Sequence, residues 1–193
     1  MTPLNPPAHA LGAPSPWISR WSHLVPPGCE VLDVACGSGR HLQWFAARGH
    51  AVVGVDREIA AARAQVPSAQ LVQADIENGP WPLATPEGPR RFGAVVVTNY
   101  LWRPLLPTLL KSLTPGGLLL YETFALGNET VGRPARPDFL LQPGELLRLC
   151  AGLDVVAYEN GFLDQPERFV QRVAAFAPAL PSPAGTQISR RPL

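Results

Sequence analysis

The stretch that most constrains this chain of 193 residues runs from Val31 to Gly39 and reads VLDVACGSG. An apolar run carries one acid, Asp33, and then breaks into a turn of small residues that contains Gly37 and Gly39. A helical pattern begins directly afterwards, near Arg40. The pattern predicts a buried strand that ends in a loop, where a ligand can approach backbone N–H groups at the start of a helix.

The rest of the chain repeats this alternation of apolar runs and helical patterns. The sequence between these segments predicts turns at 114–117 and 160–161 and a long proline-rich loop over 76–91. We assign no role to residues 78–91 of this loop. An alternation of this kind is typical of an α/β fold with a doubly wound parallel sheet and right-handed crossovers. We expect strands over 29–35, 51–55, 70–74, 92–98, 118–122, 153–159 and 168–176, and helices over 39–48, 57–66, 103–113 and 143–151.

A further helix is expected ahead of the first strand, with Ser15 as its N-cap and Pro16 in its first turn. Trp17 and Trp21 fall on one face of it, and we expect them to pack on the sheet rather than to cap a ligand pocket. We predict one domain over 15–177, preceded by a Pro/Ala-rich segment, 1–14, without ordered structure and followed by a mobile Pro/Ser-rich tail, 178–193.

Composition narrows the classes of function. The formal charge is +1, from 16 basic and 15 acidic residues, which argues against a nucleic-acid-binding protein. The three cysteines, Cys29, Cys36 and Cys150, have no metal-ligand spacing, so we expect reduced thiols, no metal and a cytoplasmic setting. We expect neither a signal peptide nor a membrane span, because no apolar run reaches the required length.

Polar residues follow the first five predicted strands, and the carboxyl ends of parallel strands meet in one crevice. Asp56 follows the second strand, where a carboxylate can accept hydrogen bonds from both hydroxyls of a ribose. Asp75 follows the third and can accept from an exocyclic amino group, while Ile76 offers apolar contact to a base. Two acids and a glycine turn suit an adenosine-containing cofactor, either NAD or S-adenosylmethionine. Leu42 stands where NAD enzymes need a third small residue, which favours S-adenosylmethionine.

The run from Val31 to Gly39 resembles the first motif of class I S-adenosylmethionine-dependent methyltransferases. The stretches 53–56, 73–76 and 114–119 support this resemblance, and within the class the chain is most similar to the tellurite-resistance methyltransferase group. The resemblance implies a Rossmann-like sheet of seven strands, mostly parallel with an antiparallel last strand. It places Asp33 near the amino end of the cofactor, Asp56 on the ribose, and Asp75 with Ile76 at the adenine. The expected cofactor-binding residues are Asp33, Ala35, Cys36, Gly37, Gly39, Asp56, Arg57, Asp75, Ile76 and Asn99.

Candidates on the acceptor side come from later loops. Tyr100 follows the fourth strand and Glu122 ends the fifth, where it either faces the acceptor or orients a loop through Arg133 or Arg136. Those two arginines would suit an anionic acceptor. His41 is expected to face solvent rather than to act as a base. No catalytic base is assigned, because a positioned polarizable anion needs none.

The expected function is methyl transfer to a small molecule, since the chain shows neither a basic face nor a separate recognition domain. Two alternatives stay open. One is an RNA or protein methyltransferase that a partner targets, and the other is a cofactor-binding module without catalysis.

Overall fold

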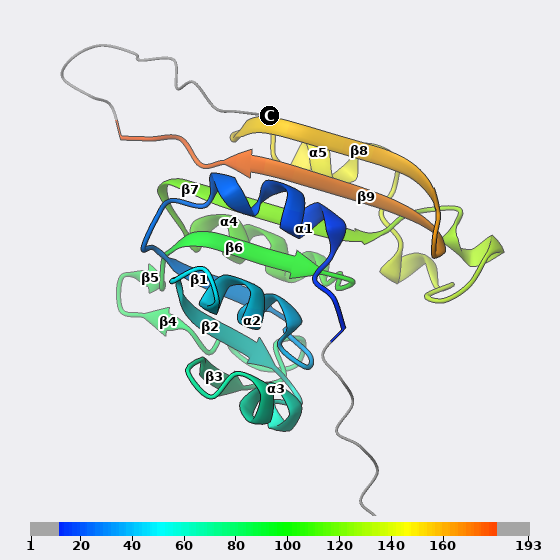
Figure 1. The fold of residues 1–193 in the computed structure, drawn as a ribbon. Helices are drawn as coiled ribbons and strands as arrows, with labels where there is room; N and C mark the ends of the chain where they lie inside the picture. The colour runs from blue at the N-terminus through cyan, green and yellow to red at the C-terminus, as the bar shows by residue number, and fades with distance from the viewer. Residues whose placement is uncertain (1–11, 181–193) are drawn as a thin grey trace, which may run out of the picture.

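The computed structural model describes residues 12–180, which form an α/β fold around one mixed sheet of seven strands (Figure 1). The sheet order is β3-β2-β1-β6-β7-β9-β8, and β9 runs in the opposite direction to the other six strands. The predicted seven-stranded sheet with an antiparallel last strand is therefore confirmed. The strands are β1 (Glu30–Val34), β2 (Ala51–Asp56), β3 (Gln70–Gln73), β6 (Phe92–Thr98), β7 (Leu113–Phe124), β8 (Asp154–Asp164) and β9 (Glu167–Phe176).

Helices cover both faces of the sheet (Figure 1). On one face, Trp17, Phe45 and Ala62 bring three helices into one buried cluster. On the other, Leu109 and Leu146 bring two helices into a second cluster. The helices of the first face are α1 (Pro16–Trp21), α2 (Arg40–Ala46) and α3 (Ala60–Gln65), and those of the second are α4 (Leu106–Lys111) and α5 (Glu145–Leu149).

The first helix begins as its sequence predicts. Ser15 accepts a hydrogen bond from the Trp17 amide at 3.1 Å, so it is the N-cap of α1. Trp17 and Trp21 are both buried, and the Trp17 indole donates to the carbonyl of Val173 on β9. The expectation that they pack on the sheet is confirmed.

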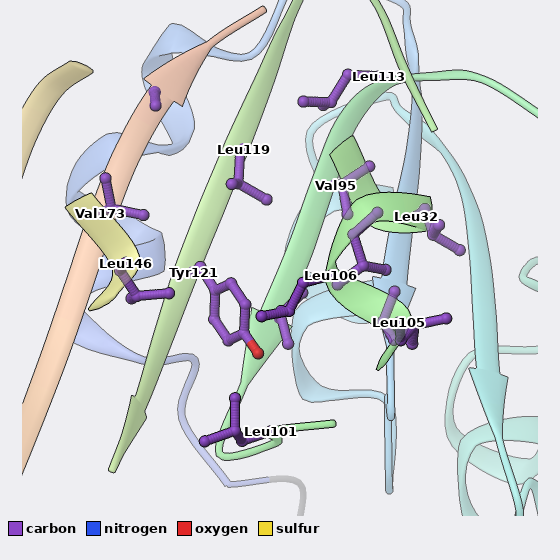
Figure 2. Close-up of a cluster of buried hydrophobic side chains, with 14 of the residues drawn as sticks. Leu32, Val95, Leu101, Leu105, Leu106, Leu113, Leu119, Tyr121, Leu146 and Val173 are labelled. Atoms are coloured by element: carbon purple, nitrogen blue, oxygen red, sulfur yellow. The ribbon is translucent and has the colours of Figure 1, made fainter. Parts of the chain in front are cut away.

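The second cluster supports the carboxyl ends of the central strands. Figure 2 shows Tyr121 of β7 among Leu106 of α4, Leu146 of α5 and Leu101 of the loop after β6. The Tyr121 hydroxyl donates a 2.9 Å hydrogen bond to the carbonyl of Tyr100. A buried core residue thus fixes the backbone of the loop that follows β6.

Two predicted turns belong to strands instead. The stretch 114–117 lies inside β7, where Gly116 has a φ of 73° and the pairing with β6 shifts register between Phe92 and Ala94. The stretch 160–161 lies inside β8, which pairs with β9 as far as Asp164 and Glu167.

Aromatic packing explains the longer hairpin. Phe162 and Phe169 lie opposite each other on β8 and β9 with ring centroids 5.0 Å apart, and such a cross-strand pair stabilises the ladder beyond the expected turn.

The loop over 76–91 contains a small antiparallel pair, β4 (Ala84–Thr85) and β5 (Gly88–Pro89). Next to it, Arg90 donates to Glu30 at 2.6 Å and to Gln70 at 3.0 Å, which ties this loop to the start of β1 and β3.

Most of the predicted N-terminal segment and of the predicted tail lies outside the described residues, so the domain limits stay a prediction. No helix within residues 12–180 is long and apolar enough to cross a membrane.

Candidate functional site

The turn after β1 has the backbone shape that its small residues predict. Ala35, Gly37 and Gly39 have φ values of 54°, 54° and 86°, in the left-handed region that glycine adopts most readily. A left-handed alanine is uncommon, and such outliers cluster at ligand sites. A Cβ on Gly39 would lie 3.3 Å from the side chains of Ala62 in α3 and of Val66, which follows α3, so that position also needs a small residue.

Three hydrogen bonds fix this turn. The Cys36 amide donates to the Val55 carbonyl at 3.2 Å, and the Gly39 amide donates to the Cys36 carbonyl at 2.9 Å. The Gly37 amide donates to Oδ2 of Asp56 at 2.8 Å. Since two of these bonds reach β2, the ends of β1 and β2 form one unit.

A pocket of about 270 Å³ opens beside this unit. It brings together five of the predicted cofactor residues, Ala35, Asp56, Arg57, Asp75 and Ile76. Its remaining lining residues are Glu58, Ala74, Glu77 and Tyr100. Of these, the sequence interpretation missed Glu58, Ala74 and Glu77, although each lies within two residues of a predicted strand-end acid.

The two acids of this pocket also have local roles. Asp56 Oδ1 accepts from the Glu58 amide at 2.9 Å. Asp75 Oδ1 accepts from the amides of Glu77 and Asn78, and its Oδ2 accepts from the Asn78 side chain. The Asn78 side chain, followed by the two amides, lowers the pKa of Asp75, which is thus a carboxylate at neutral pH. Both acids therefore cap their loops while they line the pocket.

Asp33 lies behind the turn and is 1% exposed. Burial raises its pKa to about 8, the nearby Arg40 opposing this effect. Its Oδ2 accepts no hydrogen bond from the described residues and lies 3.8 Å from Nδ1 of His41. An unpartnered buried carboxyl oxygen fits a site that awaits a donor such as an ammonium group.

His41 is buried at 1% exposure, so the prediction that it faces solvent is wrong. Its Nε2 accepts from the Ser15 amide at 3.1 Å, which leaves the Nδ1 proton on the side of Asp33. Burial, reinforced by Arg40, lowers the pKa of His41 to about 3, so the ring is neutral. The sequence alone could not reveal that α1 covers this position.

Glu122 requires a similar correction. It is fully buried and accepts hydrogen bonds from Ser15 at 2.9 Å, Arg172 at 3.2 Å and Arg168 at 3.4 Å. The expected link to Arg133 or Arg136 is absent from residues 12–180, because β9 pairs with β7 and places Arg172 opposite Glu122. Glu122 therefore belongs to a buried ion-pair network and lines neither pocket of this site.

A second pocket, of about 260 Å³, lies next to the first and shares Glu77 and Tyr100 with it. Two predicted residues, Asn99 and Tyr100, line it, and Asn99 has a left-handed φ of 54°. Arg133 and Arg136 are exposed and are not among its lining residues. The other lining residues are Leu101, Thr123, Phe124, Pro134 and Phe139.

The three cysteines are free thiols, as expected. Burial raises the pKa of Cys36 and of Cys150, which fits small buried side chains rather than nucleophiles. Across residues 12–180 no group of three or more His, Cys, Asp or Glu side chains could hold a metal ion.

Comparison with known proteins finds likenesses to methyltransferases. Residues 31–117 match the family model of a methyltransferase domain. A trans-aconitate 2-methyltransferase from Paracidovorax citrulli is 34% identical over 123 residues, which is 60% of this chain and 44% of that protein. One from Escherichia coli O157:H7 is 29% identical over 172 residues, 82% of this chain and 56% of that protein. The chain thus spans about half the length of these relatives.

Solved structures agree on the fold. TehB from Haemophilus influenzae aligns with a TM-score of 0.63 at 20% identity, over 83% of this chain and 61% of that chain. A methyltransferase from Methanosarcina mazei aligns with a TM-score of 0.65 at 14% identity, over 88% and 100% of the two chains. Residues 31–117 thus resemble a methyltransferase domain, and the whole fold resembles that of these solved structures, as the sequence predicts.

Proposed function

We propose that this chain, whose domain is of the class I S-adenosylmethionine-dependent methyltransferase type, transfers a methyl group from S-adenosylmethionine to a small molecule. The observation that carries the proposal is the pair of adjoining pockets. One is lined by the strand-end acids Asp56 and Asp75, and the other opens from it past Tyr100 and Glu77. Two adjoining pockets suit a cofactor and an acceptor that must meet.

The residues around the first pocket fit the cofactor. Asp56 would accept from the ribose hydroxyls, and Asp75 with Ile76 would contact the adenine. The free Oδ2 of Asp33 suits the α-ammonium group, and the crowding at Gly39 keeps the turn close to α3. The remaining cofactor-binding proposals are Ala35, Cys36, Gly37, Arg57 and Asn99, which lie in the turn, at the end of β2 and after β6.

When bound, S-adenosylmethionine supplies an electrophilic methyl group attached to a sulfonium sulfur. The chain's own residues then need to position the acceptor and exclude water. Tyr121 fixes the Tyr100 backbone, which places the Tyr100 side chain between the two pockets. An acceptor that is already a nucleophile needs no general base, whereas one that carries a proton on the reacting atom needs a group to accept that proton.

A small-molecule acceptor has two supports. The curated relatives are named for trans-aconitate, a small organic anion. The second pocket is also small, near the lower end of the size range of ligand sites. A cytoplasmic setting belongs to the same proposal and is supported by the free cysteines.

Calorimetry with S-adenosylhomocysteine and NAD in parallel tests the cofactor. We expect S-adenosylhomocysteine to bind and NAD to bind far more weakly, and a preference for NAD would overturn the proposal.

Isotope-labelled methyl transfer in a cell extract tests the acceptor. We expect the label in the filtrate of a membrane that retains macromolecules. Label that stays with retained RNA or protein would support the partner-targeted alternative, whereas binding without any transfer would support the non-catalytic one.

A further inference from the structure

We propose that the second pocket selects an acceptor with a small apolar body, an N–H or O–H donor group and no anionic group. This inference rests on the proposed methyl transfer and names the substrate class of the same site. It differs from the expectation that Arg133 and Arg136 favour an anion.

The walls of the second pocket are mostly apolar. Leu101, Phe124, Pro134 and Phe139 line it together with the ring of Tyr100. These side chains come from three separate segments, namely the loop after β6, the end of β7 and the loop that carries Phe139. Their apolar surface and the volume of about 260 Å³ suit a body the size of one ring.

The charge of the pocket is acidic. Glu77 is the one charged side chain among its described lining residues, and the other polar ones are Asn99, Thr123 and Tyr100. An anionic acceptor would meet this carboxylate without a cation to balance it, whereas an ammonium or a hydroxyl group could donate to it. The Glu77 carboxylate could also take the proton that such a group must lose before its lone pair attacks the methyl group.

The arginines near the second pocket, Arg103 and Arg136, form ion pairs with acids outside it. Arg103 donates to both carboxylate oxygens of Glu145 and to the carbonyls of Asp138 and Leu140. Arg136 pairs with Asp138 at 3.0 Å on the surface, with both side chains 73% exposed. The Arg136 guanidinium also lies 5.3 Å from the centre of the Phe139 ring, and Phe139 lines the pocket. These arginines therefore build the loop around the pocket rather than bind in it.

Tyr100 adds a second polar group beside Glu77 in this pocket. Its hydroxyl is buried beside the Glu77 carboxylate, with no described residue in good hydrogen-bond geometry to it, while its backbone is fixed by Tyr121. Burial, followed by the nearby Glu77, raises its pKa, so the phenol stays neutral and can donate or accept. A bound acceptor could therefore form hydrogen bonds with both the Tyr100 hydroxyl and the Glu77 carboxylate, which lie side by side at this pocket.

The test uses matched pairs of ligands with the full chain saturated by S-adenosylhomocysteine. Ligand-observed NMR would compare phenethylamine and 4-methylphenol with phenylacetate and trans-aconitate. We expect the amine or the phenol to bind at least about ten-fold more tightly than either anion, the size of a lost charge-assisted hydrogen bond. The two donor ligands separate an amine acceptor from a hydroxyl acceptor.

Variants test whether the second pocket causes the ligand preference. Glu77→Gln should reduce the preference for phenethylamine over phenylacetate by about ten-fold. Phe139→Ala should weaken every ligand that binds, whereas Phe162→Ala, an exposed aromatic on β8, should change none.

The outcomes separate the two proposals. If S-adenosylhomocysteine fails to bind, the proposed function is wrong. If it binds, then tighter binding of an anion, equal binding of both classes, or no binding by any of the four ligands overturns the acceptor assignment alone.

Discussion

Oδ2 of Asp56 accepts a 2.8 Å hydrogen bond from the amide of Gly37, which joins the end of β2 to the turn after β1. The other oxygen of the same carboxylate accepts from the Glu58 amide. The Asp56 side chain therefore fixes two segments of the first pocket, the glycine turn after β1 and the loop after β2 that contains Glu58. A ribose that bound here would meet a carboxylate whose position is already fixed.

Replacing Asp56 with alanine should weaken the binding of S-adenosylhomocysteine by roughly 1–3 kcal/mol, because hydrogen bonds to a charged acceptor are lost. Titration calorimetry measures this change. Asp164→Ala is the matched control, since that acid is exposed at the far end of β8. An unchanged affinity in Asp56→Ala would mean that Asp56 serves only as a loop cap.

The strand ends of this site could be predicted from the sequence, because an acidic residue or a glycine turn directly follows each apolar run. Asp56, Asp75 and the glycine turn carry that signal locally. Glu122 and His41 could not be placed in the same way. Their environments depend on Ser15 at the start of α1 and on the arginines of β9, which come from distant parts of the chain.

The same reason explains the acceptor side. The sequence suggests an anion site from Arg136 in a polar loop, but it cannot show that Asp138, two residues later, pairs with that arginine. Nor does a pattern show that the Tyr100 hydroxyl is buried beside Glu77. Local motifs predict the residues of the first pocket, whereas the second pocket depends on how segments far apart in the chain pack together.

Gly39→Ala should destabilise the fold and weaken cofactor binding. Gly39 has a φ of 86°, a conformation that costs an L-residue roughly 1–2 kcal/mol, and its new Cβ would lie 3.3 Å from Ala62 and Val66. Gly49→Ala separates the two effects, because Gly49 has a φ of 82° with no atom within 4 Å of the added Cβ.

Urea unfolding and calorimetry should show a loss of stability in both variants and a loss of S-adenosylhomocysteine affinity in Gly39→Ala alone. Equal affinities in the two variants would show that close packing of the turn on α3 is not required for the site.

Asp33 should make stability fall as the pH rises from about 3.8 to about 8, and because His41 has the opposite effect below pH 6.5, the net fall should be clearest from about 6.5 to about 8. Its pKa is about 8 in the folded protein and 3.8 as the ordinary value, so over this range the folded state binds a proton that the unfolded state has lost. His41 acts in the opposite sense at lower pH. Its pKa of about 3 lies below the ordinary 6.5, so its contribution to stability is lost as the pH falls below 6.5.

Urea unfolding at a series of pH values measures both effects. Asp33→Asn should flatten the decline between pH 6.5 and pH 8, since an amide does not titrate there. An identical decline in the variant and the original protein would show that other groups cause it.

Glu122→Gln should destabilise the fold by about 3–5 kcal/mol, because it removes the charge that balances two largely buried arginines. Glu122 is 1% exposed as a side chain and Arg168 and Arg172 are 15% exposed, while Arg172 retains Glu159 as a second partner. Asp138→Asn is the control, since its pair with Arg136 is 73% exposed on both sides and is worth at most about 1 kcal/mol. Urea unfolding compares the two losses. Similar small losses would mean that the network on this face contributes little, and that the Trp17 and Trp21 packing alone keeps α1 on the sheet.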